Sequence, residues 1–190
     1  MKRTIWGAVL IAAVASGPTF AQQADAPQAP ADPVTLAAAA PVVTAVDPGR
    51  GAVTNLPLPR YVSLKSTEGN ARRGPGLTHR IDWVFTRAGM PLRITAEFEN
   101  WRRIEDQDGA GGWVHYTLLS GVRTVLVAQD MAEFRGRPDR ASDVVAQAEF
   151  GVIAKLLECA TDWCRVSAAG EKGWVRKTAL WGVDPGELVE

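Results

Sequence analysis

The chain repeats one pattern of tryptophan, glycine and valine, and this repeat constrains the fold more than any other feature. Trp101-Arg102-Arg103-Ile104 is matched by Trp163-Cys164-Arg165-Val166, and Gly112-Trp113-Val114 is matched by Gly173-Trp174-Val175. The two copies lie about sixty residues apart, and a fixed spacing of this kind indicates a duplicated structural unit. We therefore expect two similar small domains in tandem.

Each copy has the periodicity of β-strands. Residues 92, 94 and 96 are apolar and alternate with polar residues at 93, 95 and 97, which predicts a strand with one face on a core. The segment "EDQDGAGG" predicts a hairpin turn, and "YTLL" and "KTAL" predict a short helical turn at the end of each copy. Short strands with regular turns are typical of small all-β barrels.

The N-terminus is predicted to be an export signal. Lys2 and Arg3 precede an apolar stretch, and small residues follow it, so we expect cleavage after Ala21. The apolar stretch is shorter than the ~20 residues that cross a bilayer, so no transmembrane segment is expected after cleavage. The protein is therefore predicted to be periplasmic or secreted.

Residues 22–59 are rich in alanine and proline and contain no aromatic residue. Such a segment cannot bury enough apolar surface to offset its chain entropy, so a disordered linker is predicted. The predicted organisation is a signal peptide at 1–21, this linker at 22–59, barrels at 60–126 and 127–183, and a tail at 184–190.

Charge and cysteine content exclude some classes of protein. The chain has 21 basic and 21 acidic residues, whereas a nucleic-acid-binding protein normally has a basic excess. Cys159 and Cys164 flank a hairpin-sized connection, and in an exported chain such a pair predicts a disulfide. A reactive thiol pair is the alternative, but the pair lacks Cys-x-x-Cys spacing.

The tryptophans and arginines of the repeat are the candidate ligand-binding residues. Alternation places Ile104 on the core side of its strand, so its neighbours Trp101 and Arg103 should face away from the core. The complete set of candidates is Trp101, Arg103, Trp113, Trp163, Arg165 and Trp174. Exposed tryptophan beside arginine is common in recognition surfaces. The alternative is that these tryptophans cover the barrel ends or pack between the domains.

The ordered set of motifs resembles the bacterial SH3 domain family, in its exported tandem form from Gram-negative bacteria. The resemblance lies at residues 70–75, 81–84, 101–104 and 112–115, and again at Arg135, Pro138, 163–166, 173–176 and 179–183. It implies a small, strongly bent β-barrel that has no chemistry of its own and usually binds peptides or cell-wall material. In the second copy Gly136-Arg137 replaces Arg73-Gly74, which leaves the geometry of its first loop open.

No cofactor, metal site or catalytic residue is predicted. His79 and His115 are the only histidines, and neither has partners at metal-ligand spacing. The glycines of "DGAGG" are followed by no Gly-Lys-Ser/Thr, so they predict a turn and no phosphate-binding loop.

We therefore expect two tandem SH3-like barrels that act as a non-enzymatic binding or scaffolding module. The expected ligand is cell-wall peptide or an envelope protein. The alternatives are a peptidoglycan hydrolase with an unrecognised site and a structural, self-associating protein. The sequence leaves open whether both barrels bind.

Overall fold

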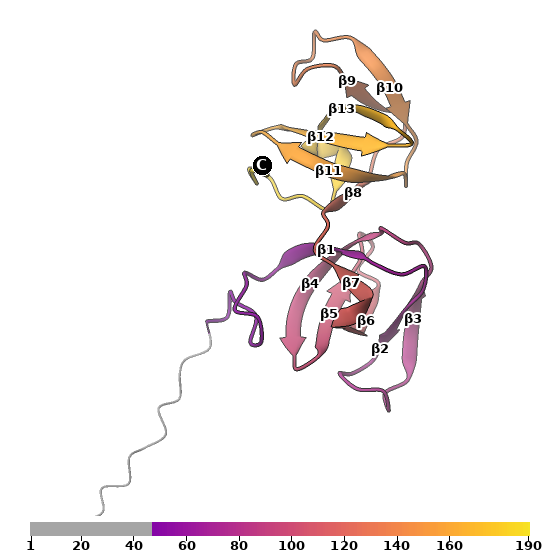
Figure 1. Ribbon diagram of the computed structural model, residues 1–190, viewed down its shortest axis with the longest axis vertical. Helices are drawn as coiled ribbons and strands as arrows, with labels where there is room; N and C mark the ends of the chain where they lie inside the picture. Colours follow the sequence, from indigo (N-terminus) through magenta and orange to yellow (C-terminus); the bar gives the residue numbers. More distant parts are fainter. Residues whose placement is uncertain (1–46) are drawn as a thin grey trace, which may run out of the picture. The chain divides into compact units, whose positions relative to one another are not determined.

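The computed structural model describes residues 47–190, whose strands form two separate sheets (Figure 1). Seven strands form a first antiparallel sheet in the order β3-β2-β6-β5-β4-β1-β7. Their bounds are β1 (Arg60–Leu64), β2 (Gly69–Arg72), β3 (Ile81–Phe85), β4 (Pro91–Phe98), β5 (Trp101–Glu105), β6 (Gly111–His115) and β7 (Leu119–Ser120).

A second sheet repeats this arrangement strand for strand, in the order β10-β9-β13-β12-β11-β8-β14. Its strands are β8 (Thr124–Val127), β9 (Ala132–Arg135), β10 (Val144–Ala148), β11 (Ile153–Cys159), β12 (Trp163–Ala168), β13 (Glu171–Arg176) and β14 (Leu180–Trp181). The predicted helical turns are the 3-10 helices η1 (Tyr116–Leu118) and η2 (Lys177–Ala179). The predicted all-β fold with two tandem units is confirmed, and we refer to the units as the first and second barrel.

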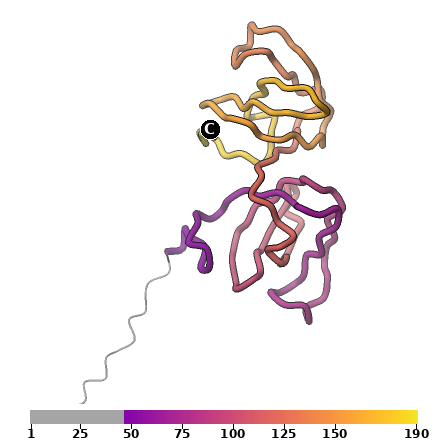
Figure 2. Tube along the Cα trace, in the orientation of Figure 1, coloured from indigo at the N-terminus to yellow at the C-terminus, as the bar shows by residue number. Residues whose placement is uncertain are grey.

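Each barrel has its own hydrophobic core, and the trace in Figure 2 passes through the first barrel before it enters the second. The first core consists of Leu64, Ala71, Phe85, Leu92, Ile94, Ile104 and Val114. The second core is larger and includes Val125, Phe134, Leu156, Val166, Val175 and both cysteines. Two separate cores agree with the duplication that the sequence predicts.

A β-bulge changes which side chains of β4 face the core. The register with β5 shifts between Ile94 and Ala96, so Ala96 lies opposite Arg103. A bulge adds one residue to a strand and so moves the following side chains to the other face. The expected alternation through Ala96 is therefore wrong beyond Ile94, and Glu97 is buried instead. An equivalent shift in β11, between Leu156 and Glu158, places Glu158 opposite Arg165.

The buried Glu97 holds the segment before β1 against the first barrel. Its carboxylate accepts hydrogen bonds from the backbone N–H and the hydroxyl of Thr54, at 2.8 and 2.7 Å, and from the backbone N–H of Val53 at 3.1 Å. Arg60 donates to the same carboxylate at 2.6 Å, and Arg102 lies 3.4 Å away. Burial alone would raise the pKa of Glu97, but these donors outweigh it and lower the pKa to about 2.

The described part of the predicted linker is therefore ordered. Residues 47–59 form a turn in which Arg50 pairs with Pro57, and Glu97 binds this turn. The prediction of a disordered linker up to residue 59 is therefore wrong for residues 47–59. These residues have few apolar side chains to bury, but the buried carboxylate of Glu97 binds them through hydrogen bonds. The signal peptide at 1–21 and the rest of the linker lie outside the described residues.

The boundary between the barrels also differs from the prediction. Strand β8 begins at Thr124 and pairs with β11 and β14 of the second sheet. A boundary at 126/127 would cut this strand. The boundary between the barrels therefore lies between Ser120, where β7 ends, and Thr124. The run Thr124–Val127 is buried throughout, and such a run carries no alternation that would assign it to one barrel.

Cys159 and Cys164 form a disulfide across the turn between β11 and β12, and both are buried in the second core. The predicted tail also contacts this barrel, because the backbone N–H of Cys159 donates to Val189 O at 2.8 Å. Glu187 accepts from Arg123 at 2.7 Å, and this contact lowers the pKa of Glu187 against the opposing effect of burial.

Membrane-spanning helices are absent from residues 47–190, because no helix there is both long and apolar enough to cross a bilayer.

We expect the substitution Glu97→Gln to destabilise the first barrel at neutral pH. The folded-state pKa of about 2 lies below the ordinary 4.5, so the ionised carboxylate stabilises the fold above pH 4.5. At ~1.4 kcal/mol per pKa unit this contribution is about 3 kcal/mol, and it is lost as the pH falls from 4.5 through 2. Urea melts at pH 7, 4 and 2 measure it, with Glu68→Gln at an exposed site as control. Equal stability of the Glu97 variant and the parent at pH 7 would contradict the assignment.

We expect the double substitution Cys159→Ala, Cys164→Ala to destabilise the second barrel by about 2 kcal/mol, because the disulfide restricts the unfolded chain. Amide hydrogen exchange should become faster in β11 and β12, with the amides of β4 and β5 as internal control. Unchanged protection in β11 and β12 would show that the disulfide does not stabilise this barrel.

Candidate binding site: a tryptophan between two arginines in each barrel

One cross-strand row in the first barrel brings together a tryptophan and two arginines. Strand β6 lies between β2 and β5, and Trp113 pairs with Arg72 on one side and with Arg103 on the other. Residues directly opposite each other in an antiparallel sheet share a face, with Cβ atoms about 5 Å apart. The side chains of Arg72, Trp113 and Arg103 therefore lie on one face, and all three line the same hollow. Trp113 is half-buried, and Arg103 is exposed.

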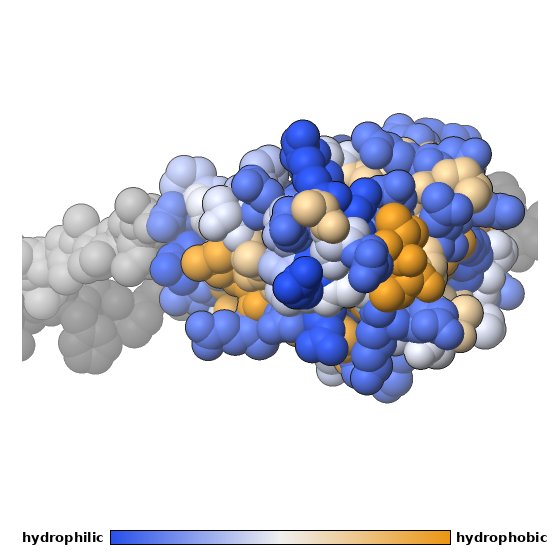
Figure 3. Space-filling model, turned by 90° about the horizontal axis from the view of Figure 1, so that it is seen from above, coloured by the Kyte–Doolittle hydropathy of each residue, from blue (hydrophilic) through white to orange (hydrophobic). Residues whose placement is uncertain are grey.

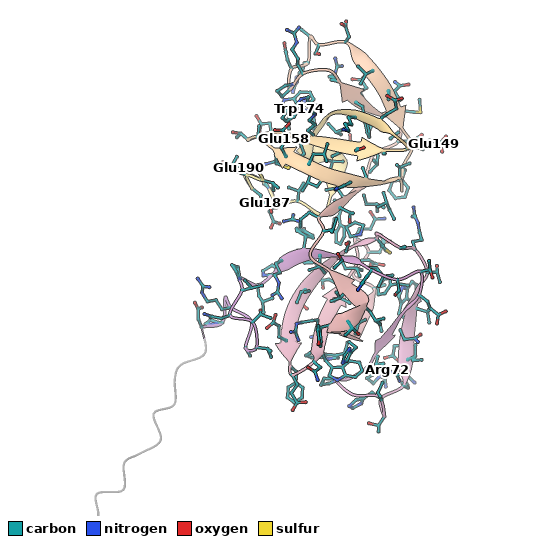
Figure 4. The ribbon with its side chains drawn as sticks, in the orientation of Figure 1. Arg72, Glu149, Glu158, Trp174, Glu187 and Glu190 are labelled. Atoms are coloured by element: carbon teal, nitrogen blue, oxygen red, sulfur yellow. A yellow bond between two sulfur atoms is a disulfide. The ribbon has the colours of Figure 1, made fainter. Side chains whose placement is uncertain are left out.

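The second barrel contains the same row. Trp174 pairs with Arg135 on β9 and with Arg165 on β12. Figure 4 labels Trp174 together with Glu158, which pairs with Arg165 from β11. We call the two sets Arg72–Trp113–Arg103 and Arg135–Trp174–Arg165 the Arg–Trp–Arg rows. They bring together four of the six candidates that the sequence predicts.

The glycine before each tryptophan permits this arrangement. A Cβ at Gly112 would lie 2.6 Å from the carbonyl oxygen of Arg72, and a Cβ at Gly173 would lie 2.6 Å from Cβ of Phe134. Any side chain there would push β6 away from β2, or β13 away from β9. The Gly-Trp-Val motif therefore combines a close strand contact with an outward tryptophan and an inward valine, and Val114 and Val175 are both in the cores.

Arg72 and Arg135 also hold the loops that open each repeat. Nη1 of Arg72 donates to the carbonyls of Leu77 and His79, at 3.1 and 2.7 Å. Nη1 of Arg135 donates to the carbonyls at positions 140 and 142, at 2.6 and 2.5 Å. The exchange of Arg73-Gly74 for Gly136-Arg137 therefore leaves the loop anchor intact.

Trp101 does not face solvent as predicted. Its side chain lies outside the first core, but only 8% of it is exposed, and it packs edge-on against His115 with ring centres 5.6 Å apart. The expectation that Trp101 offers a free surface is wrong, because lateral packing on the outer face buries it. Its counterpart Trp163 is half-buried and lies 5.8 Å from the guanidinium of Arg176.

Each barrel has a hollow beside an arginine of its row, but the second hollow is lined by neither Trp174 nor Arg165. The first hollow has a volume of about 340 Å³, and its lining includes Arg72, Arg73, Asp82, Arg103 and Trp113. Arg73 donates to Asp82 at 3.0 Å, and this hydrogen bond holds the pKa of Asp82 below its ordinary value. The second hollow, of about 580 Å³, has mixed charge, and its lining includes Asp130, Glu133, Arg135, Arg140, Trp163 and Arg176.

Sequence reasoning missed two arginines of this face and an exposed tryptophan that lies outside it. Arg72 and Arg135 pair with tryptophans that are far away in the sequence. The signal that could have found these arginines is their equivalent position in the two repeats. Trp83 lies in the motif at 81–84 and is 48% exposed on the edge strand β3. Its ring packs edge-on near the buried Phe85, so it covers an end of the first core.

The first barrel has another hollow away from its row, of about 370 Å³, whose lining includes Tyr61, Ile94 and Tyr116. Figure 3 shows one face, which is largely hydrophilic and carries separate apolar patches. Residues 47–190 contain no group of three or more His, Cys, Asp or Glu side chains that could hold a metal ion. His115 bonds Thr117 at 2.8 Å, and His79 lies in the loop that Arg72 holds.

Comparison with curated proteins and solved structures finds distant structural similarity alone. No curated protein matches the chain. Solved structures similar to it include NlpC2 and NlpC1 from Trichomonas vaginalis, at 15% and 14% identity and a TM-score of 0.31 each. The matches cover 66% and 69% of this chain but only 50% and 48% of those proteins. This chain thus spans about half their length, and so low a similarity carries no argument about its function.

The family match is more informative, because it covers more than half of the chain. The family described as bacterial SH3 domain matches twice, at residues 65–121 and 128–182. Both matches fall on the strands that carry the Arg–Trp–Arg rows. The chain therefore belongs to the bacterial SH3 domain family, of which it contains two copies.

Proposed function

We propose that this protein is a non-enzymatic, exported module that binds peptides of the bacterial cell wall through the outer faces of its two barrels. The observation that carries this proposal is the Arg–Trp–Arg row, which occurs in both barrels at the same place. Bacterial SH3 domains generally bind cell-wall material, which supports the choice of ligand.

The chemistry of the rows suits a peptide ligand. A half-buried indole offers a rigid apolar surface that costs little conformational entropy when a ligand covers it. The guanidinium groups beside it donate several hydrogen bonds in a fixed plane and match carboxylates and backbone carbonyls. Wall peptides carry both kinds of acceptor. The arginines of one row can therefore bind the carboxylate or carbonyls of a short extended peptide, while the indole contacts one of its side chains.

The proposal assigns no catalytic step to this chain. Its two cysteines are bonded to each other, so no free thiol is available as a nucleophile. The face instead combines a hollow in the first barrel with arginines that already hold loops and a neighbouring acid. Such a face suits recognition, and export to the periplasm would bring it into contact with the wall.

We expect the double substitution Trp113→Ala, Trp174→Ala to weaken binding to isolated sacculi about tenfold, because each removes the aromatic centre of a row. Co-sedimentation of the purified protein with sacculi measures the affinity, and a thermal melt checks the fold. Trp83→Ala removes an exposed tryptophan outside the rows and is the matched control. Unchanged sedimentation of a folded double variant would contradict the proposal.

The same sacculi test the enzymatic alternative. Incubation with the parent protein should leave the wall intact, and the protein should be recovered with the pellet. Release of soluble muropeptides above a protein-free control would show hydrolysis. Failure of the parent to pellet, together with capture of one envelope protein, would favour a protein partner instead.

A further inference from the structure

The Arg–Trp–Arg rows have the same architecture in the two barrels but a different charge. In the second barrel each arginine of the row has its own carboxylate. Arg135 forms an ion pair with Glu133, and Arg165 forms one with Glu158 at 3.2 Å. The two positive charges of this row are therefore balanced within the protein.

The first barrel lacks both of these carboxylates. Asn70 precedes Arg72 by the same interval at which Glu133 precedes Arg135, and Ala96 faces Arg103 where Glu158 faces Arg165. Neither Asn70 nor Ala96 can balance a charge. Among residues 47–190, no carboxylate pairs with Arg72 or Arg103.

The two uncompensated arginines line one hollow. Arg72 uses Nη1 for the carbonyls of its loop, whereas the side chain of Arg103 donates no hydrogen bond among the described residues. Asp82 is the single acid in the lining, and Arg73 and Arg80 already bind it at 3.0 and 2.5 Å. The lining of the hollow therefore carries more positive than negative charge, and its one carboxylate is already paired.

A carboxylate fits this arrangement best. Guanidinium groups bind carboxylates through planar, charge-assisted hydrogen bonds, which are stronger than neutral ones. Trp113 lies between the two arginines, so its ring can cover the carbon atoms next to a bound carboxylate. A small inorganic anion would leave this apolar surface unused.

We propose that the first barrel binds a peptide carboxylate between Arg72 and Arg103, against Trp113. The equivalent row in the second barrel does not take one, because Glu133 and Glu158 occupy its arginines. The inference rests on the proposed function, since it specifies which group of a wall peptide is bound and by which barrel.

The test uses the indole N–H signals of Trp113 and Trp174 in ¹⁵N-labelled full-length protein. The probe is N-acetyl-Ala-Ala with a free C-terminal carboxylate, and its C-terminal amide is the matched control. We expect the acid to shift the Trp113 signal and leave the Trp174 signal unmoved, and we expect the amide to shift neither. Equal shifts with acid and amide, or a larger response of Trp174, would overturn the inference.

Variants at the exposed arginines separate the site from general electrostatics. Arg103→Gln should weaken acid binding about tenfold, because a charge-assisted hydrogen bond is lost, whereas Arg165→Gln should leave it unchanged. Arg103 is chosen because Arg72 also anchors a loop. Equal loss in both variants would mean that net charge, and no specific site, attracts the probe.

Exchange of the acids between the barrels is the sharpest test. Asn70→Glu with Ala96→Glu should abolish the Trp113 response, and Glu133→Asn with Glu158→Ala should make the Trp174 signal respond to the acid. Amide spectra show whether each variant is folded. If the folded second-barrel variant stays silent, the internal carboxylates do not explain the difference and the inference fails.

Two further measurements complete the test. A phosphate titration identifies the bound anion, and a comparison of sacculus binding with peptide binding separates this inference from the proposed function. Inorganic phosphate at matched ionic strength should shift Trp113 less than the acid peptide, and an equal or larger shift would overturn the peptide assignment. If the protein pellets with sacculi but the acid peptide moves no indole signal, the inference fails and the proposed function stands. If the peptide binds and the protein does not pellet, the proposed function fails instead.

Discussion

The close contact between two strands in each barrel determines where the recognition face can form. Gly112 and Gly173 allow β6 and β13 to approach β2 and β9 more closely than any side chain would permit. This contact places an arginine of the loop-bearing strand directly beside the tryptophan. The residue after each tryptophan, Val114 or Val175, packs in the core of its barrel. The Gly-Trp-Val motif is thus at once a packing device and the centre of the candidate site.

Duplication preserved this scaffold while the charge around it diverged. In both barrels an arginine, Arg72 or Arg135, binds the loop that follows it. In both barrels a bulge in the long strand β4 or β11 also places one residue opposite the other arginine of the row. At that position the first barrel has Ala96 and the second has Glu158. A change of one side chain on a shared backbone can therefore change what a face binds without a change of fold.

The sequence was sufficient for the fold and for part of the site. The repeat, the alternation and the hairpin turns predicted two all-β barrels with separate cores, and the close cysteines predicted the disulfide. These signals are local or periodic. The errors involve contacts between distant residues, since Trp101 is buried by neighbours on the outer face and Glu97 orders a segment that its composition marks as disordered. Arg72 was missed for the same reason, because its partner lies four strands further along the chain.

A ligand bound by this protein should contact the outer face of the Arg–Trp–Arg row. The most direct measurement is a map of backbone amide shifts over the full chain during titration with soluble muropeptides. We expect the largest shifts on β2, β5 and β6 around Trp113. Shifts concentrated on the edge strands β3 and β10, with β5 and β6 unaffected, would contradict it.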